Sequence, residues 1–186
     1  MRNISILLFL ILPICIKSQN NHLLGSGIGI SIGSPANFDE KRIFLNATYI
    51  FNYKYLLTKS SFNFAESTKF RNEFRLFQFI GISTNLNKPI SWHFLLGFGY
   101  ITATDRNYII SSTHGVEKYT YIDGGTPAIS SGLLINPFKS KIFILGIEAS
   151  ILHEKIDNGF TTLSAFPITY SINFIIKINR KSYESN

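Results

Sequence analysis

Hydrophobic and polar residues alternate along most of this chain with a period of two. The segment 91–100, SWHFLLGFGY, gives the clearest case. Because side chains alternate across a strand, one of its faces is large and apolar and the other is small or polar. The apolar face carries Trp92, Phe94, Leu96, Phe98 and Tyr100, and the other carries Ser91, His93, Leu95, Gly97 and Gly99. The pattern predicts a strand whose apolar face meets either a protein core or lipid.

The same alternation predicts strands of roughly ten residues along the chain, and helical periodicity is missing. The candidate strands are residues 24–33, 43–53, 56–66, 70–83, 91–100, 127–135, 141–152 and 168–178. About ten residues is the length that a tilted strand needs to cross a membrane. After residue 18, no segment is apolar for long enough to form a transmembrane helix.

The segments between the candidate strands alternate in length. Short turns rich in Asn, Pro and Lys are expected at 52–54, 85–89 and 136–140, and longer polar loops at 34–41, 66–69, 104–126 and 153–162. Short periplasmic turns and long external loops are typical of an outer-membrane barrel. Pro127 and Pro167 fall at expected strand starts, where a missing amide donor does least harm.

The composition of the polar face indicates which face of the strands contacts water. A soluble lipocalin-like barrel would place its apolar face inward and a highly charged face in water. Here the polar face is rich in Gly and Ser, and only 16% of the chain is charged. The polar-face charges are Lys59, Glu73, Arg75, Glu148 and Lys177. Small residues with a few charges of both signs suit the inside of a narrow barrel, so we expect the apolar face to contact lipid.

Aromatic residues support the same orientation, because membrane barrels carry an aromatic girdle at each interface. Tyr53, Trp92 and Phe138 fall near the turn side, whereas Phe64, Tyr100, Tyr121 and Tyr170 fall near the loop side. The expected fold class is all-β, an eight-stranded antiparallel up-and-down transmembrane β-barrel.

The first residues predict export. Met1 and Arg2 give a positive start, and the apolar run from Ile6 to Ile16 is too short to span a bilayer. We expect a signal peptide at 1–18, a barrel at 19–179 and a polar tail at 180–186. Cys15, the single cysteine, lies in this leader, and Ile14 before it disfavours a lipoprotein. The mature chain would therefore have no disulfide and no thiol chemistry.

Removing Arg2 and Lys17 with the leader leaves 16 basic and 11 acidic residues. The basic residues do not form a tract with interleaved aromatics, so nucleic acid is not an expected partner. They gather near expected loops, at Lys41-Arg42, 69–71, Arg106, Lys118 and Lys155. This rim is either simply solvated or in contact with anionic lipid headgroups.

The leader, the alternation and the loop pattern resemble those of the small eight-stranded outer-membrane barrels of Gram-negative bacteria, the OmpA and OmpX type. The resemblance covers about residues 22–178. It implies a location in the outer membrane, contact with lipid and lipopolysaccharide, and insertion by the barrel assembly machinery. Such barrels often end on an aromatic residue of the last strand, whereas here the tail 179–186 follows.

Candidate catalytic and binding residues are few. His22, His93, His114 and His153 show no metal-ligand spacing, and the glycines from Gly25 to Gly33 miss the nucleotide-binding spacing, so we expect neither a metal nor a cofactor. We expect these glycines to allow close packing inside the barrel. Ser150, His153 and Glu154 lie near one loop end, but Ser150 and His153 face opposite sides of a regular strand. We therefore expect no enzyme.

An eight-stranded barrel is wide enough only for its own side chains or one small ligand. The expected role is non-enzymatic and structural, surface-binding or interacting, with loop 104–126 as either the recognition element or a plain connector. The alternatives are a narrow channel for small apolar molecules, a lipid A-modifying enzyme and a soluble periplasmic lipocalin-like binder. Inside the barrel, Glu73 and Glu148 need cationic partners, for which Arg75 and Lys59 are the candidates.

Overall fold

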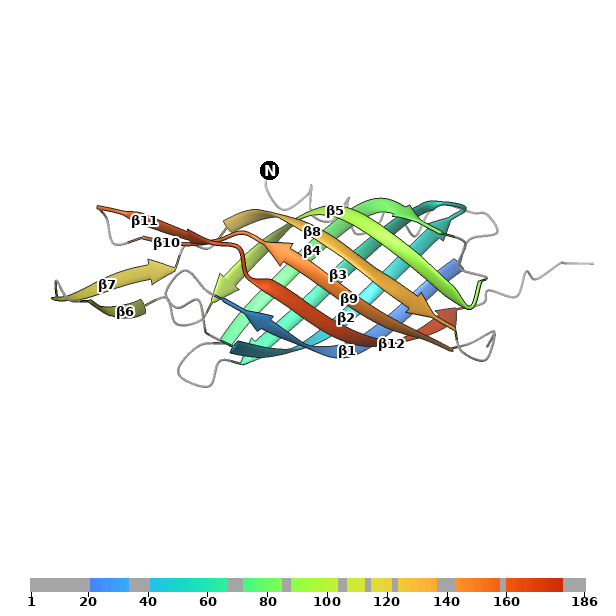
Figure 1. The fold of residues 1–186 in the computed structure, drawn as a ribbon, viewed down its shortest axis with the longest axis horizontal. Helices are drawn as coiled ribbons and strands as arrows, with labels where there is room; N and C mark the ends of the chain where they lie inside the picture. The colour runs from blue at the N-terminus through green and yellow to red at the C-terminus, as the bar shows by residue number, and fades with distance from the viewer. Residues whose placement is uncertain are drawn as a thin grey trace, which may run out of the picture.

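The chain forms a closed β-barrel that carries a second, smaller sheet at one end (Figure 1). The structure, a computed structural model, describes residues 21–33, 41–66, 72–84, 88–103, 107–112, 115–121, 124–136, 143–157 and 160–178. The barrel strands are β1 (Asn21–Ile32), β2 (Lys41–Tyr53), β3 (Leu56–Glu66), β4 (Asn72–Ser83), β5 (Ile90–Ala103), β8 (Gly124–Ile135), β9 (Phe143–Leu152) and β12 (Ile168–Ile178). Over the described ranges, no helix has the length and apolar character needed to cross a membrane.

The barrel closes between its first and last strands. The order around the wall is β1-β12-β9-β8-β5-β4-β3-β2, and each neighbouring pair is antiparallel. The closing ladder runs from His22 opposite Ile178 to Ile32 opposite Ile168. The expected eight-stranded antiparallel barrel is therefore confirmed.

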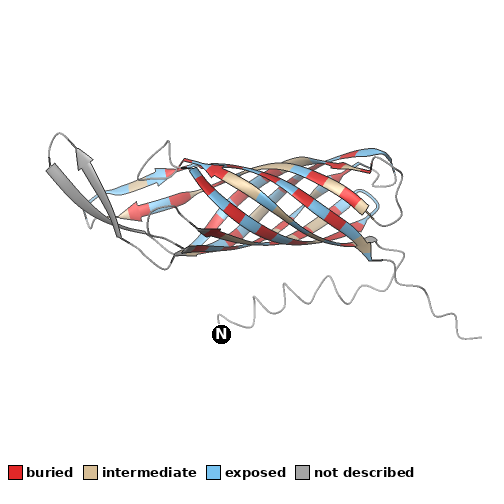
Figure 2. Ribbon diagram, turned by 90° about the horizontal axis from the view of Figure 1, so that it is seen from below, coloured by how far each residue is buried: buried red, intermediate tan, exposed pale blue. Residues whose placement is uncertain are grey.

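The apolar face of the strands lies on the outside of the barrel. Buried and exposed residues alternate along the wall strands (Figure 2). In β5, Leu96 is 54% exposed and Phe98 62%, whereas Leu95 between them is fully buried. A soluble barrel would show the reverse, so this orientation argues against the lipocalin-like alternative and for a lipid-facing outer surface.

The interior is less polar than the sequence pattern suggested. A layer of buried aliphatic residues fills the lumen near the turn ends of the strands: Leu23, Leu57, Leu95, Leu134, Ile144 and Ile175. These side chains share the inward face with the glycines, serines and charges that defined it as polar. A narrow lumen leaves little room for water. Aliphatic side chains can therefore pack against one another at this end without exposing apolar surface to water.

Glycines on the inward face make room for aromatic rings from the neighbouring strand. Gly99 stands opposite Phe77 and Gly97 opposite Phe79 in the β4–β5 ladder. A Cβ atom at either glycine would overlap the facing phenyl ring. Gly29 in β1 accommodates the ring of Phe44 in the same way, which confirms the expected packing role of the β1 glycines.

Four further strands lie in or directly next to segments expected to be loops. They are β6 (Asn107–Ser112), β7 (Gly115–Tyr121), β10 (Glu154–Asp157) and β11 (Thr162–Ala165), and they form one sheet in the order β11-β10-β7-β6. We call this the external sheet. The expectation of plain loops at 104–126 and 153–162 is therefore wrong in part, because strands of four to seven residues are too short to show a clear alternation. Tyr121 lies in β7, not in the barrel wall, so it does not belong to the aromatic girdle.

The external sheet is a continuation of the barrel. Ile151 pairs with Ile168, and Glu154 pairs with Ala165 in the same register, so β9–β10 and β11–β12 form one long ribbon. The ribbon is interrupted where Pro167 lacks an amide donor, although the amide of Leu152 still donates to the carbonyl of Pro167 at 3.4 Å. Beyond this break, β10 pairs with β7. A single break in the ladder thus separates the barrel from the external sheet.

Of the two prolines expected at strand starts, Pro167 directly precedes β12, whereas Pro127 does not mark the start of its strand. Pro127 lies inside β8, three residues after its start, but the ladder from β8 to β9 begins only at Ala128 and Leu152, so no bond to β9 is lost. Lys54 has a φ of 55° in the turn between β2 and β3. Asn52 supports this turn by donating from Nδ2 to the carbonyls of Lys54 and Leu56, each at 3.2 Å.

Some expectations fall on residues that the structure does not describe. They include the leader 1–18 with Cys15, the tail 180–186, the basic segment 69–71, Arg106, His114 and Phe138. The boundaries of the signal peptide at 1–18, the barrel at 19–179 and the tail at 180–186 stay predictions.

Candidate functional site: the lumen and its external mouth

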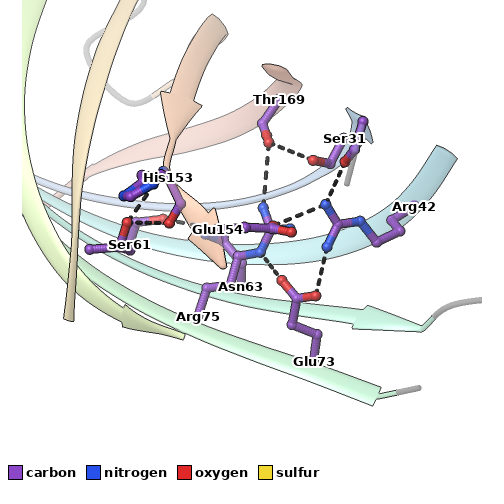
Figure 3. A network of polar contacts seen from close by, with 11 residues as sticks. Ser31, Arg42, Ser61, Asn63, Glu73, Arg75, His153, Glu154 and Thr169 are labelled. Carbon is purple, nitrogen blue, oxygen red and sulfur yellow. Dashed lines mark hydrogen bonds and ion pairs between the residues drawn. The ribbon is translucent and has the colours of Figure 1, made fainter. Parts of the chain in front are cut away.

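A cluster of two arginines and two glutamates fills the loop end of the lumen (Figure 3). Arg42 of β2 donates to Glu73 of β4 at 2.8 Å and to Glu154 of β10 at 2.9 Å. Arg75 of β4 donates to Glu154 at 3.0 Å and also pairs with Glu73. We call these four residues the mouth cluster. Each is at most 1% exposed, and their formal charges cancel.

Neighbouring polar groups complete the cluster. Arg42 also donates to the carbonyl of Gly33 at 2.8 Å, and Arg75 reaches the hydroxyl of Thr169 at 3.4 Å. The Thr169 hydroxyl in turn donates to Ser31 at 3.1 Å. Buried charges are tolerated only when they are paired and hydrogen-bonded, so the cluster is stable only as a complete set. It spans the lumen from β2 and β4 to β10 at the loop end of the barrel.

A second ion pair lies deeper in the lumen. Lys59 of β3 pairs with Glu148 of β9, and the Nε2 atom of His93 lies 3.4 Å from the second carboxylate oxygen. The Lys59 ammonium also lies 5.1 Å from the centre of the Phe79 ring, within the range of a cation–π contact. Beyond this pair, toward the turns, the aliphatic layer begins.

A small cavity separates the two charged groups. Its volume is about 20 Å³, and its lining includes Asn46, Lys59, Ser61, Glu148 and Ser171. This is room for about one water molecule. The described residues therefore leave little free volume between the two charged groups.

The expected interior ion pairs are present. Glu73 meets Arg75, and Glu148 meets Lys59, so both hypotheses are confirmed. The prediction that Arg42 belongs to the basic rim near the loops is wrong, because Arg42 is buried in the mouth cluster. Period-two alternation predicts its inward orientation, because Arg42 shares a face with Phe44 and Asn46. The same count from Glu148 through Leu152 places Glu154 on the inward face.

His153 lies at the junction between the barrel and the external sheet. Its ring stacks on Phe166 with centroids 4.9 Å apart, and the Thr126 hydroxyl bonds both its amide and its carbonyl. Partial burial, and then the nearby Lys155, lower the pKa of His153 below its ordinary value of 6.5. The ring is therefore neutral at neutral pH, and its contacts fix the direction in which β10 leaves β9.

The three candidate catalytic residues do not contact one another in the structure. Ser150 lines the lumen cavity, His153 stacks on Phe166, and Glu154 is held by the arginines of the mouth cluster. The described histidines are also far apart in the fold, since His22 bonds Tyr49 near the turns and His93 lies in the lumen. Throughout the described ranges, no group of three or more His, Cys, Asp or Glu residues could hold a metal ion.

Polar side chains on the outer face pair with one another. Gln78, which interrupts the apolar face of β4, accepts a hydrogen bond from Ser60 at 2.6 Å. The Trp92 indole donates to Ser131 at 3.0 Å, and Ser131 donates to the carbonyl of His93. Because each pair is satisfied locally, these groups are compatible with a lipid environment.

Comparison with known proteins gives fold neighbours only. No protein-family model matches the chain, and no curated protein matches its sequence. Neisserial surface protein A superposes with a TM-score of 0.61 at 8% identity, covering 87% of this chain and 98% of that one. OprG from Pseudomonas aeruginosa gives 0.53 at 10% identity, covering 87% and 97%. Ail, the attachment invasion locus protein of Yersinia pestis, gives 0.50 at 18% identity, covering 86% and 97%.

The similarity in fold agrees with the apolar outer surface of the barrel wall. The three neighbours, of which OprG is described as an outer-membrane protein, are matched over nearly their whole length, and the present chain shares their fold. An apolar outer band on such a barrel is the surface that lipid requires. The chain therefore has the fold of the small eight-stranded outer-membrane β-barrels, with an apolar band on its outer surface.

Proposed function

We propose that the protein is a closed, non-enzymatic outer-membrane anchor that displays the external sheet to a partner outside the cell. The observation that carries the proposal is the contrast between the two parts of the molecule. Buried charged and aliphatic side chains occupy the lumen, whereas the segments beyond the mouth form a four-stranded sheet.

The filled lumen supports an anchoring role over transport. The mouth cluster occupies the loop end, and the aliphatic layer occupies the turn end. An ion would have to leave water to pass the aliphatic layer, at a cost of many kcal/mol. The same filling, together with the separation of Ser150, His153 and Glu154, supports a role without catalysis.

The external sheet supports a recognition role. The chain continues the β9–β12 ribbon past the mouth in unbroken register and joins it to the β6–β7 hairpin. Such a sheet presents a fixed surface, which lowers the entropic cost of binding compared with a mobile loop. Ail, one of the fold neighbours, has a name that describes attachment. We expect lipid and lipopolysaccharide around the barrel and the barrel assembly machinery as its folding partner.

Cysteine labelling in intact cells tests this orientation. The expected mature chain has no cysteine, so Phe160→Cys, at a position 96% exposed between β10 and β11, would introduce a single thiol. A membrane-impermeant maleimide should label it in intact cells. The matched variant Tyr55→Cys, in the turn between β2 and β3, should react only after the outer membrane is opened.

Mass spectrometry of the labelled chains should also show loss of residues 1–18. Labelling of Tyr55→Cys but not Phe160→Cys in intact cells would reverse the topology. A retained leader would contradict the export assignment.

A variant in which a short Gly-Ser turn replaces residues 104–123 should still insert, because the barrel ladders do not include that segment.

A further inference from the structure

The cavity between the mouth cluster and the Lys59–Glu148 pair contains a buried oxygen atom that lacks a hydrogen bond. Asn46 of β2 lines this cavity and is 7% exposed. Over the described ranges, no donor reaches its Oδ1 atom. Buried polar atoms in folded proteins are nearly always hydrogen-bonded, either to protein or to ordered water. A partner for Asn46 is therefore expected inside the cavity.

Lys59 brings spare donors to the same cavity. Its ammonium group has three N–H bonds and no acceptor. Glu148 accepts a hydrogen bond from it, and the centre of the Phe79 ring lies 5.1 Å from the Nζ atom. In the part of the chain that the structure describes, the ammonium group donates to no other oxygen. Because Lys59 also lines the cavity, a further N–H can donate to a ligand there.

Two serines of the lining have unused hydrogen-bonding capacity of opposite kinds. The Ser171 oxygen accepts a hydrogen bond from Nδ2 of Asn173 at 3.3 Å, so its hydroxyl proton can still be donated. The Ser61 hydroxyl donates to Oδ1 of Asn63 at 3.3 Å, so its oxygen can still accept. Together with the ammonium group and the carboxamide oxygen, the lining holds two donors and two acceptors.

Strand β1 leaves the space between these groups open. It lies between β2 and β12 in the wall. Gly27 of β1 stands opposite Asn46 of β2, and Gly29 stands opposite Ser171 of β12. Glycine in a strand allows close approach of neighbouring groups. β1 therefore places no side chain between the groups that β2 and β12 contribute.

From this arrangement we infer a binding site for one buried water molecule. The water accepts hydrogen bonds from Lys59 and Ser171 and donates to Asn46 and Ser61. The cavity volume of about 20 Å³ exceeds the roughly 10–15 Å³ that a buried water needs. A neutral ligand fits the site, because the charged groups of the lining already form ion pairs. The site lies within the lumen, so it does not depend on the proposed orientation of the barrel in the membrane.

High-resolution crystal structures of the mature protein, grown from a lipidic phase in bromide salt, test the site. The wild type should show one electron-density peak within hydrogen-bonding distance of all four partners. Ser171→Val fills the cavity with methyl groups and removes one donor, so the peak should disappear. Ser130→Val makes the same change at a buried serine outside the lining and should keep the peak.

Asn46→Leu is the second test variant and keeps the site testable if Ser171→Val does not fold. It removes an acceptor and fills the cavity, so its structure should also lack the peak. The absence of a peak in the wild type, or a peak that persists in both test variants, would overturn the inference. Loss of the peak in Ser130→Val would assign it to general repacking of the lumen and also overturn it. An anomalous bromide signal at the peak would show that the cavity binds an anion instead.

Discussion

At the scale of single residues, the fold depends on which side of the wall each side chain faces. The outward positions of β5 carry Trp92, Phe94 and Leu96, all more than a third exposed, and the inward positions carry buried Ser91 and His93. Exposed apolar groups of this size are favourable only in contact with lipid. A charge introduced on the outer face should therefore cost free energy according to its depth in the bilayer.

Leu96 and Tyr100 provide the test of depth. Leu96 lies near the middle of β5 and Tyr100 near its loop end, and both face outward. Leu96→Arg should lower the free energy of unfolding in lipid vesicles by about 2–4 kcal/mol, and Tyr100→Arg by about 0–1 kcal/mol. Urea unfolding in vesicles and the heat-dependent gel shift of folded barrels would measure the difference. Equal effects of the two substitutions would place the lipid belt elsewhere.

The Lys59–Glu148 pair provides a test inside the barrel. Glu148→Gln leaves the Lys59 ammonium buried without its carboxylate, and breaking a buried pair on one side costs about 3–5 kcal/mol. We expect a clear drop in unfolding free energy. The double variant K59M/E148L removes both charges and should recover most of the loss. If the single and double variants lose the same unfolding free energy, side-chain packing and not charge pairing accounts for the stability that this site contributes.

At the scale of strands, alternation alone predicted the barrel but not all of its interior. The eight strand segments follow from a period of two, and the turn and loop sides follow from the alternating lengths of the connecting segments. The inward face mixes Gly, Ser and charges with Leu57, Leu95 and Phe79, and sequence order does not tell which of these share a level of the lumen. That depends on strand tilt and shear. The external strands are short, and their pairing partners are distant in sequence.

Glu154 links the barrel to the external sheet, and its removal should loosen that sheet. Its carboxylate, which comes from β10, forms ion pairs with Arg42 of β2 and Arg75 of β4. Glu154→Gln should therefore speed amide hydrogen exchange in β10 and β11, while exchange in β1 and β12 stays slow. Lys155→Gln, one residue away and facing outward, is the control and should leave exchange unchanged. Unchanged exchange in Glu154→Gln would mean that the β-ladders alone hold the sheet.

At the scale of the whole molecule, two different barriers occupy the lumen. The mouth cluster is polar and could rearrange, whereas the aliphatic layer at the turn end excludes ions by its lack of hydration. The external sheet lies beyond the first barrier, and both chain ends of the barrel lie beyond the second, where β1 begins and β12 ends. The two barriers act in series, so removing either one should not open the barrel.

Planar-bilayer recordings test this series arrangement. We expect no conductance above the lipid baseline for the wild type, and none for Glu154→Gln, because Leu57 and Leu95 still block the turn end. Leu57→Ser with Leu95→Ser should also remain silent, because the mouth cluster is intact. Only the combined triple variant should pass ions, and its heat-dependent gel shift would show that it is folded. Steady current through the wild type would refute the closed lumen. Current through Glu154→Gln alone would show that the mouth cluster is the single barrier and that the aliphatic layer is permeable.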